Sequence, residues 1–126
     1  MRESFDVMVQ RVRQPILDVV LDLKPRLIHE LQCKSDYVSF PIEGANMVPI
    51  ILYLRVGNYR VGRDIKLSSV ISTISVYPEH WRKGWFKAVI SACEDVARST
   101  GLECVDIENV LVPEIVQYLT SVGFVS

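Results

Sequence analysis

The sequence is poor in the residues that build metal centres and disulfide-stabilised domains. It contains three cysteines and two histidines, and the cysteines are far apart with no CxxC pair among them. Two histidines are too few for a site with several histidine ligands, and an odd number of scattered cysteines argues against a disulfide framework or a zinc module. We therefore expect no metal site and a reducing, cytoplasmic location.

The sequence also lacks an excess of either charge and any long apolar run. Fourteen basic and fifteen acidic residues leave a formal net charge of -1, so a chain-wide attraction to nucleic acid is not expected. No run approaches the ~18–20 apolar residues that cross a bilayer, and residues 1–4 do not resemble the start of a signal peptide. The sequence predicts a protein that does not span a membrane.

Apolar side chains, in contrast, are abundant: they make up 49% of the 126 residues, against 23% charged ones. That balance is typical of a folded globular domain and not of a disordered chain. The length suits one domain, and no internal repeat or linker divides it. We expect residues 1–126 to form a single domain.

The N-terminal part of the chain is expected to contain a strand followed by helical segments. Apolar residues at every second position from Phe5 to Val9 predict a short strand. Apolar residues then recur at helical spacing, and Pro25 should break or kink that stretch because it lacks an N–H group. The pattern fits equally well one bent helix or two short helices, over 15–23 and 25–32.

The middle of the chain is expected to form an antiparallel sheet. A loop over residues 36–49 contains a brief extended segment at 37–40. Runs rich in β-branched residues then predict three strands, over residues 50–56, 59–63 and 69–76. Gly57 and Asn58 are the residue types that favour a tight turn between the first two of these strands. The three strands should form a meander.

The last part of the chain is expected to alternate helix, strand and helix. A helix should begin after Gly84 and end at Gly101, which is placed to cap it. The strand at 102–107 follows a helical crossover, so it should lie parallel to the strand at 69–76. Pro113 should open a final helix. The resulting order, β-α-α-β-β-β-α-β-α, predicts a mixed α/β (α+β) fold.

The segment from Ile74 to Ile90 carries the clearest chemical signal, because it combines a strand, a tight loop and a helix start. The first N–H groups of a helix lack internal partners, so this loop favours an anion such as a phosphate. Arg82, Lys83 and Lys87 add positive charge there, and a glycine at position 84 lets the backbone approach closely. The alternative is an ordinary surface loop with solvated cations.

These residues resemble the acyl-CoA motif of the GNAT N-acyltransferases. Val76-Tyr77-Pro78-Glu79 is similar to the turn that ends the motif strand of that family, and Gly84 matches the first glycine of its loop. The strand at 102–107 and the Gly123-Phe124 pair are similar to the elements that follow. The resemblance implies a mixed sheet with helices on both faces, and an acyl-CoA-dependent N-acetyltransferase that acts on a primary amine of a small molecule or protein.

The resemblance also implies where acetyl-CoA would bind. The backbone of Ile74 and Val76 would pair with the amides of the pantetheine arm. The N–H groups of six consecutive residues would hold the pyrophosphate: Arg82, Lys83, Gly84, Trp85, Phe86 and Lys87. The family's general acid is often a tyrosine near the Gly-Phe pair, a role for which Tyr118 is the candidate here. Glu108, or Asp106 beside it, is the candidate base or substrate anchor.

Several departures from the family pattern support a second hypothesis. Trp81 and Phe86 stand where the family has Gln or Arg and Gly or Ala, and Tyr118 is displaced by one position. The spacing of Phe86 to the apolar stripe predicts that its ring points into the core. The family's strands after Gly-Phe are missing, so either a homodimer or another partner completes the sheet, or the domain is a shortened version.

The alternative to the enzyme is therefore a non-catalytic GNAT-like structural or interaction protein with weak or absent CoA binding. A third hypothesis uses Trp81, Trp85 and Phe86 to stack on single-stranded nucleic acid beside the loop cations. The balanced net charge argues against that third function.

Overall fold

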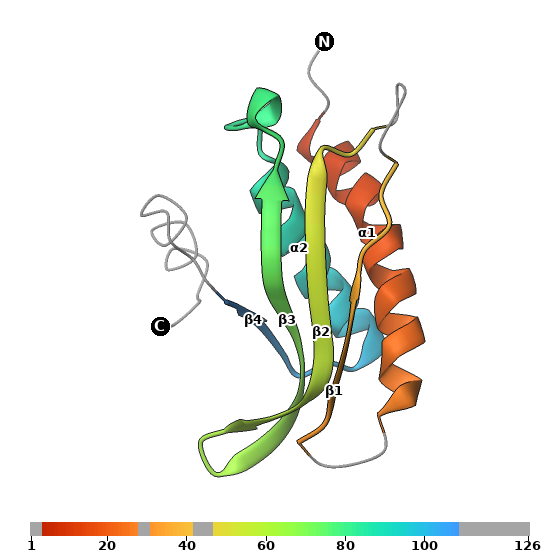
Figure 1. Cartoon of the computed structure of the whole chain (residues 1–126), viewed down its shortest axis with the longest axis vertical. Coiled ribbons are helices and arrows are strands. Elements are labelled where there is room, and N and C mark those ends of the chain that lie inside the picture. The colour runs from red at the N-terminus through yellow and green to blue at the C-terminus, as the bar shows by residue number, and fades with distance from the viewer. Residues whose placement is uncertain (1–3, 28–30, 42–46, 109–126) are drawn as a thin grey trace.

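The computed structural model describes residues 4–27, 31–41 and 47–108, and these form two layers, one of helix and one of sheet (Figure 1). The helices and strands follow one another in the order α1 (Phe5–Leu23), η1 (Lys24–Arg26), β1 (Cys33–Tyr37), β2 (Ile50–Val61), β3 (Asp64–Val76), η2 (Pro78–His80), α2 (Trp85–Thr100) and β4 (Cys104–Ile107). The elements η1 and η2 are single 3₁₀ turns.

Residues 5–9 belong to helix α1, so the predicted strand from Phe5 to Val9 is wrong. Ser4 caps helix α1, and its hydroxyl accepts a hydrogen bond from the N–H of Val7. The buried side chains of the helix stand three or four residues apart: Met8, Val12, Ile16, Val20 and Leu23. Phe5 and Val7, which suggested a strand, remain about half exposed. The helical period, and not the short alternation, decides which residues are buried.

The end of α1 also differs from the expectation. Pro15 lies inside the helix, and Pro25 ends it, as predicted, because the helical hydrogen bonds stop before that residue. The predicted second helix over 25–32 is wrong, since a 3₁₀ turn is followed by Leu27 in an extended conformation. A single helix from Phe5 to Leu23 therefore replaces both predicted arrangements.

The sheet has the strand order β1-β2-β3-β4, with antiparallel pairs except for β3 and β4, which are parallel as predicted. The predicted turn at Gly57-Asn58 is wrong, because β2 runs through it and the hairpin turns at Gly62, where φ is +62°. Gly57 is needed for a different reason: a Cβ there would lie 2.5 Å from the Cβ of Cys33. The glycine allows strand β1 to approach β2. The antiparallel meander therefore consists of β1, β2 and β3.

The second half of the described chain agrees closely with the sequence. Helix α2 starts after Gly84 and ends at Gly101, whose φ of +77° and N–H bond to the Ala97 carbonyl form the expected cap. Strand β4 follows at once. The expected helix from Pro113 and the Gly-Phe pair lie outside the described residues.

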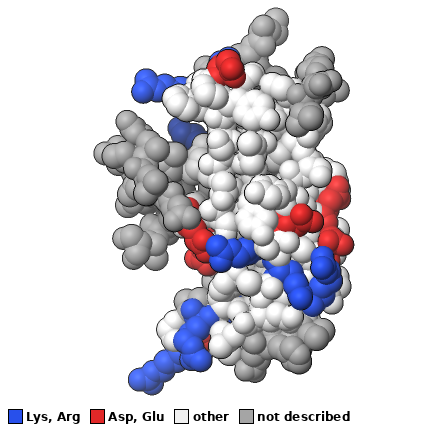
Figure 2. Space-filling view, in the orientation of Figure 1, with Lys and Arg blue, Asp and Glu red and all other residues white. Residues whose placement is uncertain are grey.

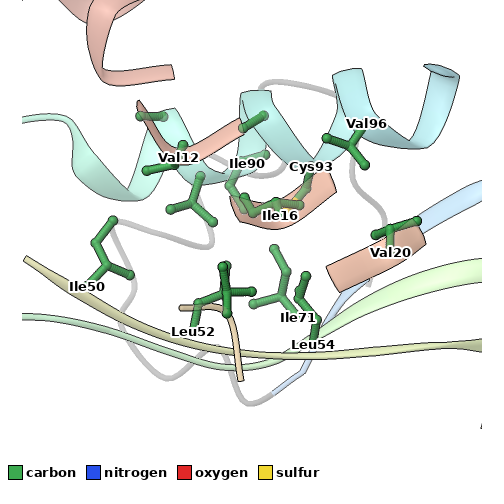
Figure 3. Packing of buried hydrophobic residues seen from close by; sticks show 14 of the residues in the cluster. Val12, Ile16, Val20, Ile50, Leu52, Leu54, Ile71, Ile90, Cys93 and Val96 are labelled. Carbon is green, nitrogen blue, oxygen red and sulfur yellow. The ribbon is translucent and has the colours of Figure 1, made fainter. Parts of the chain in front are cut away.

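One hydrophobic core joins the two layers (Figure 3). Leu52 and Leu54 of β2 and Ile71 of β3 point toward α1 and α2, where Ile16 and Ile90 meet them. Both described helices thus cover the same face of the sheet (Figure 1). The mixed α/β architecture is confirmed, but the expected arrangement with helices on both faces is not found among the described residues, because α1 and α2 share one core. The opposite face carries a different set of side chains, which bear on function.

Candidate functional site

Strands β3 and β4 stay paired for only part of the length of β3. Their register runs to Ile71 opposite Ile107, and the N–H of Glu108 donates to the carbonyl of Ile71 at 2.9 Å. At the next position a bulge interrupts the pairing with β2, because Ser72 has no partner between two paired residues. Strand β3 continues to Val76, and within the described residues no strand pairs with its β4 side beyond this point.

The backbone groups of Ile74 and Val76 face this open edge. The N–H of Tyr77 donates to the carbonyl of Pro49, so at residue 77 the backbone faces the β2 side. Backbone groups alternate along a strand, which turns residues 74 and 76 the other way. Their side chains pack against the core. The backbone groups of both residues therefore point toward the edge that no described strand occupies.

The carbonyl of Val76 already has a partner from the following loop. The indole Nε1–H of Trp81 donates to it at 2.7 Å. The 3₁₀ turn η2 brings the chain back toward the strand end, and the Trp81 side chain is itself exposed. This contact has no signal in the sequence, because it depends on how the turn folds.

The loop between η2 and the start of α2 contains two residues whose backbone is in the left-handed conformation. Arg82 has φ of +63° and Gly84, the N-cap, has φ of +94°. Gly84 has no side chain that could cap this helix, and the first N–H groups of any helix have no acceptor within the helix itself. Arg82, Lys83 and Lys87 are exposed around them. The predicted cations and the predicted helix start thus occupy one end of the molecule, next to the open edge of β3 (Figure 1).

The two aromatic residues that begin α2 point inward. Trp85 is 6% exposed, and the guanidinium of Arg11 lies over its ring, 5.6 Å from the ring centroid. Phe86 is half-buried and packs against the core, which confirms the expected inward placement. Their backbone N–H groups, and not their rings, are what this position can offer a ligand. The contact of Arg11 with this ring was not predicted, because residues 5–9 were expected to form a strand and not part of a helix packed on α2.

Glu108, a predicted catalytic residue, lies on the sheet face that the described helices leave uncovered. Its Oε2 accepts a hydrogen bond from Nη2 of Arg55 at 2.6 Å, and Ser72 accepts another from Nε of the same guanidinium at 2.6 Å. Asp106 accepts a hydrogen bond from the hydroxyl of Ser68 at 2.9 Å. Figure 2 shows charged side chains gathered in a band across the lower half of this face.

Two tyrosines near the hydrogen bonds of Arg55 and Glu108 were not among the predicted site residues. Tyr59 lies close to Cys33 on the neighbouring strand, and burial, followed by the effect of that thiol, raises the pKa of the Tyr59 hydroxyl. Tyr53 shares a 2.6 Å hydrogen bond with Ser35 on the same sheet. Strand pairing brings these residues together, so no local pattern could predict them. Tyr118, the other predicted catalytic residue, lies outside the described residues.

Neither a metal cluster nor a membrane segment occurs in the described ranges. No group of three or more histidine, cysteine, aspartate or glutamate side chains is arranged to hold a metal ion there. None of the helices found in those ranges has the length and apolarity to cross a membrane.

The structure, and not the sequence, connects this chain to known proteins. No family model and no curated protein matches the sequence. An aminoglycoside N-acetyltransferase solved in complex with CoA is similar in structure, with a TM-score of 0.54 and 16% identity over 94% of this chain and 84% of that one. A ribosomal-protein-alanine N-acetyltransferase from Brucella melitensis has a TM-score of 0.54 and 12% identity, over 92% and 88% of the two chains.

A protein with a different kind of description shares the same architecture. A transcriptional regulator from Bacillus halodurans is similar with a TM-score of 0.56 and 9% identity, over 100% of this chain and 91% of that one. At such identities the likeness shows the fold alone. The protein has a GNAT-like fold, and its activity has to be argued from its own residues.

Proposed function

We propose that this protein binds acetyl-CoA between strand β3 and the start of α2, and that it transfers the acetyl group to a primary amine. One observation carries the proposal: the edge of β3 beyond Ile71, with which no described strand pairs, lies one short loop before the N-terminus of α2, whose N-cap Gly84 has no side chain. A ligand with an extended amide arm and a diphosphate would meet backbone groups suited to each part. The fold that the chain shares with known acetyltransferases supports this assignment.

The residues of the site divide into those that would bind and those that would act on the amine. The N–H groups from Arg82 to Lys87 and the three exposed cations would hold the diphosphate, and the backbone of Ile74 and Val76 would hold the amide arm. Bound acetyl-CoA would supply an activated thioester. Glu108 or Asp106 would attract the ammonium form of the substrate and accept its proton, so that the neutral amine attacks the thioester, on the sheet face that the described helices do not cover. Hydrogen bonds from Arg55 of β2 and Ser72 of β3 orient Glu108.

Tyr118 is the proposed acid for the leaving sulfur, on the strength of the family resemblance. The acceptor is proposed to be an amine on a small molecule or a protein, and completion of the sheet edge by a second copy or another partner stays a prediction.

A second function is favoured by a specific contact. The indole N–H of Trp81 donates to the carbonyl of Val76. The chain thereby supplies its own donor to a hydrogen-bond acceptor that an extended ligand would use. A GNAT-like domain that keeps this contact permanently would act through protein contacts and not through catalysis. The two functions differ in whether acetyl-CoA binds at all.

The test is calorimetry and a melting scan with acetyl-CoA. At a ligand concentration of a hundred times Kd, binding should stabilise the fold by about 2.7 kcal/mol, which raises Tm. Arg82→Ala should weaken binding, whereas Arg63→Ala, which removes an exposed arginine in the β2–β3 turn, should not. Glu108→Gln should bind acetyl-CoA normally and release CoA more slowly when an amine is supplied. Absence of any binding at millimolar acetyl-CoA would exclude the enzyme and leave the non-catalytic function.

A further inference from the structure

Trp81 is held in an unusual way for a large apolar residue. The residue is 63% exposed, so burial contributes little to the position of its ring. What does hold the ring is its single polar atom, Nε1, which donates to the carbonyl of Val76 at 2.7 Å. That carbonyl belongs to the last residue of β3 and faces the edge of the strand with which no described strand pairs at this position.

The preceding turn positions the indole next to the carbonyl of Val76. The N–H of His80 donates to the carbonyl of Tyr77 at 2.8 Å, and the N–H of Trp81 donates to the carbonyl of Pro78 at 3.2 Å. These bonds close the 3₁₀ turn η2 and return the chain to the end of β3. The indole N–H then occupies the position that the donor of a neighbouring strand or ligand would take.

We propose that Trp81 is a reversible cap on the edge of β3, and that it determines which ligands can pair with that edge. The inference rests on the proposed acetyl-CoA site and specifies how that site selects its ligand. A ligand gains access to the Val76 carbonyl by offering an amide N–H in exchange for the indole N–H. An extended arm with secondary amides meets this requirement, and a nucleotide diphosphate without such an arm does not.

This exchange of one N–H donor for another explains how Trp81 can lie at the edge of β3 and still allow a ligand to bind there. One neutral hydrogen bond replaces another, so displacement of the indole costs only the modest net stability of a single protein hydrogen bond. That cost corresponds to about a fivefold loss of affinity for the amide-bearing ligand. In the absence of ligand the cap covers a carbonyl that would otherwise be open to pairing with another strand.

The experiment compares the wild-type protein with Trp81→Phe, which keeps an aromatic ring and removes the N–H donor. Two probes are titrated by calorimetry: CoA, and 3′-phosphoadenosine 5′-diphosphate, which carries the same phosphates without the amide arm. Trp81→Phe should bind CoA about fivefold more tightly and bind the nucleotide with unchanged affinity. The protein has two tryptophans, so the difference in emission between the two proteins reports Trp81. CoA should shift that emission, and the nucleotide should not.

Each outcome decides between the inference and the proposed function. If the wild type binds CoA and the variant binds it equally or more weakly, Trp81 is not a cap and the acetyl-CoA site stands. An equal gain for both probes would also overturn the cap, because it would place the effect at the phosphates. If CoA binds to Trp81→Phe alone, the cap is confirmed and the native chain is non-catalytic. If neither protein binds CoA, the acetyl-CoA site and the cap are both wrong.

Discussion

Arg55 holds the end of strand β4 against the bulge in strand β3: its guanidinium donates to Glu108 and to Ser72, each at 2.6 Å. The bulge residue Ser72 and Glu108, the residue that follows β4, are therefore tied together at the point where the described pairing of the two strands ends. Beyond this connection no described strand pairs with β3 on its β4 side. It also gives Glu108 a fixed orientation on the sheet face.

A double-mutant cycle should measure this connection. Arg55 and Glu108 are 35% and 37% exposed, so solvent screens their ion pair substantially. We expect a coupling free energy of about 1 kcal/mol between Arg55→Ala and Glu108→Ala, decreasing as salt is added. Urea unfolding of the four proteins at low and high salt provides the measurement. Additive effects of the two substitutions would show that the contact contributes nothing to stability.

Phe86→Ala should lower the free energy of unfolding by about 2–3 kcal/mol, somewhat less than truncation of a fully buried phenylalanine. The reason is that the ring packs against the core and is half-buried. Affinity for acetyl-CoA should not improve, because the ring does not block the start of α2. Denaturant unfolding and calorimetry on the same variant test both statements. A variant of wild-type stability that binds acetyl-CoA more tightly would show that the ring obstructs the site.

Gly57→Ala should destabilise the fold more than Gly62→Ala. A Cβ at position 57 would lie 2.5 Å from the Cβ of Cys33 and from the carbonyl of Gln32, so β1 would have to move. At position 62 no atom lies within 4 Å, and only the positive φ opposes alanine. We expect losses of about 3 and about 1 kcal/mol respectively.

Hydrogen exchange distinguishes the causes of these two losses. Gly57→Ala should raise amide exchange along β1, because that strand is displaced, and Gly62→Ala should leave it unchanged. Equal losses of stability, with β1 protected in both variants, would mean that the approach of β1 to β2 tolerates a methyl group.

The thiol of Cys93 should make stability depend on pH in the alkaline range. Burial, with a smaller effect of the Glu94 carboxylate, raises the pKa of Cys93 from 9.0 to about 12. The folded protein therefore keeps the proton while the unfolded chain loses it above pH 9. The associated stability is complete below pH 9 and is lost as the pH rises toward 12.

The comparison that isolates this effect is wild type against Cys93→Ala, since all other titrating groups are shared. The difference in unfolding free energy should fall by about 1.4 kcal/mol for each pH unit above 9. Urea unfolding at pH 8, 9, 10 and 10.5 measures it. A difference that stays constant over this range would contradict a buried, protonated thiol.

The sequence by itself determined the elements whose signals are local. Gly84 and Gly101 bound a stretch with helical period, and α2 begins and ends there. The β-branched run before Pro78 is followed by a helix and then by another strand. This order also specified the parallel pairing of β3 with β4. Such elements can be predicted because caps, proline positions and hydrophobic periods act within a few residues of the chain. The same signals placed the cationic loop at the start of α2.

Tertiary structure decided what local signals left ambiguous. Residues 5–9 fit a strand as well as a helix, and burial of Met8 and Val12 against α2 and the sheet selected the helix. Gly57 is a residue type that is common in turns, but the close approach of strand β1 is the reason that a glycine is required there. In both cases the competing local conformations differ little in energy, and contacts from distant segments supply the difference.

The candidate site divides in the same way. The loop cations and the helix start were visible in the sequence because they are neighbours along the chain. The bond from Arg55 to Glu108 joins residues 53 positions apart, and the bond from Trp81 to Val76 depends on the fold of the turn between them. Side chains so placed meet only after the sheet has paired and the turn has closed, so their partners follow from the packed structure and not from the order of residues.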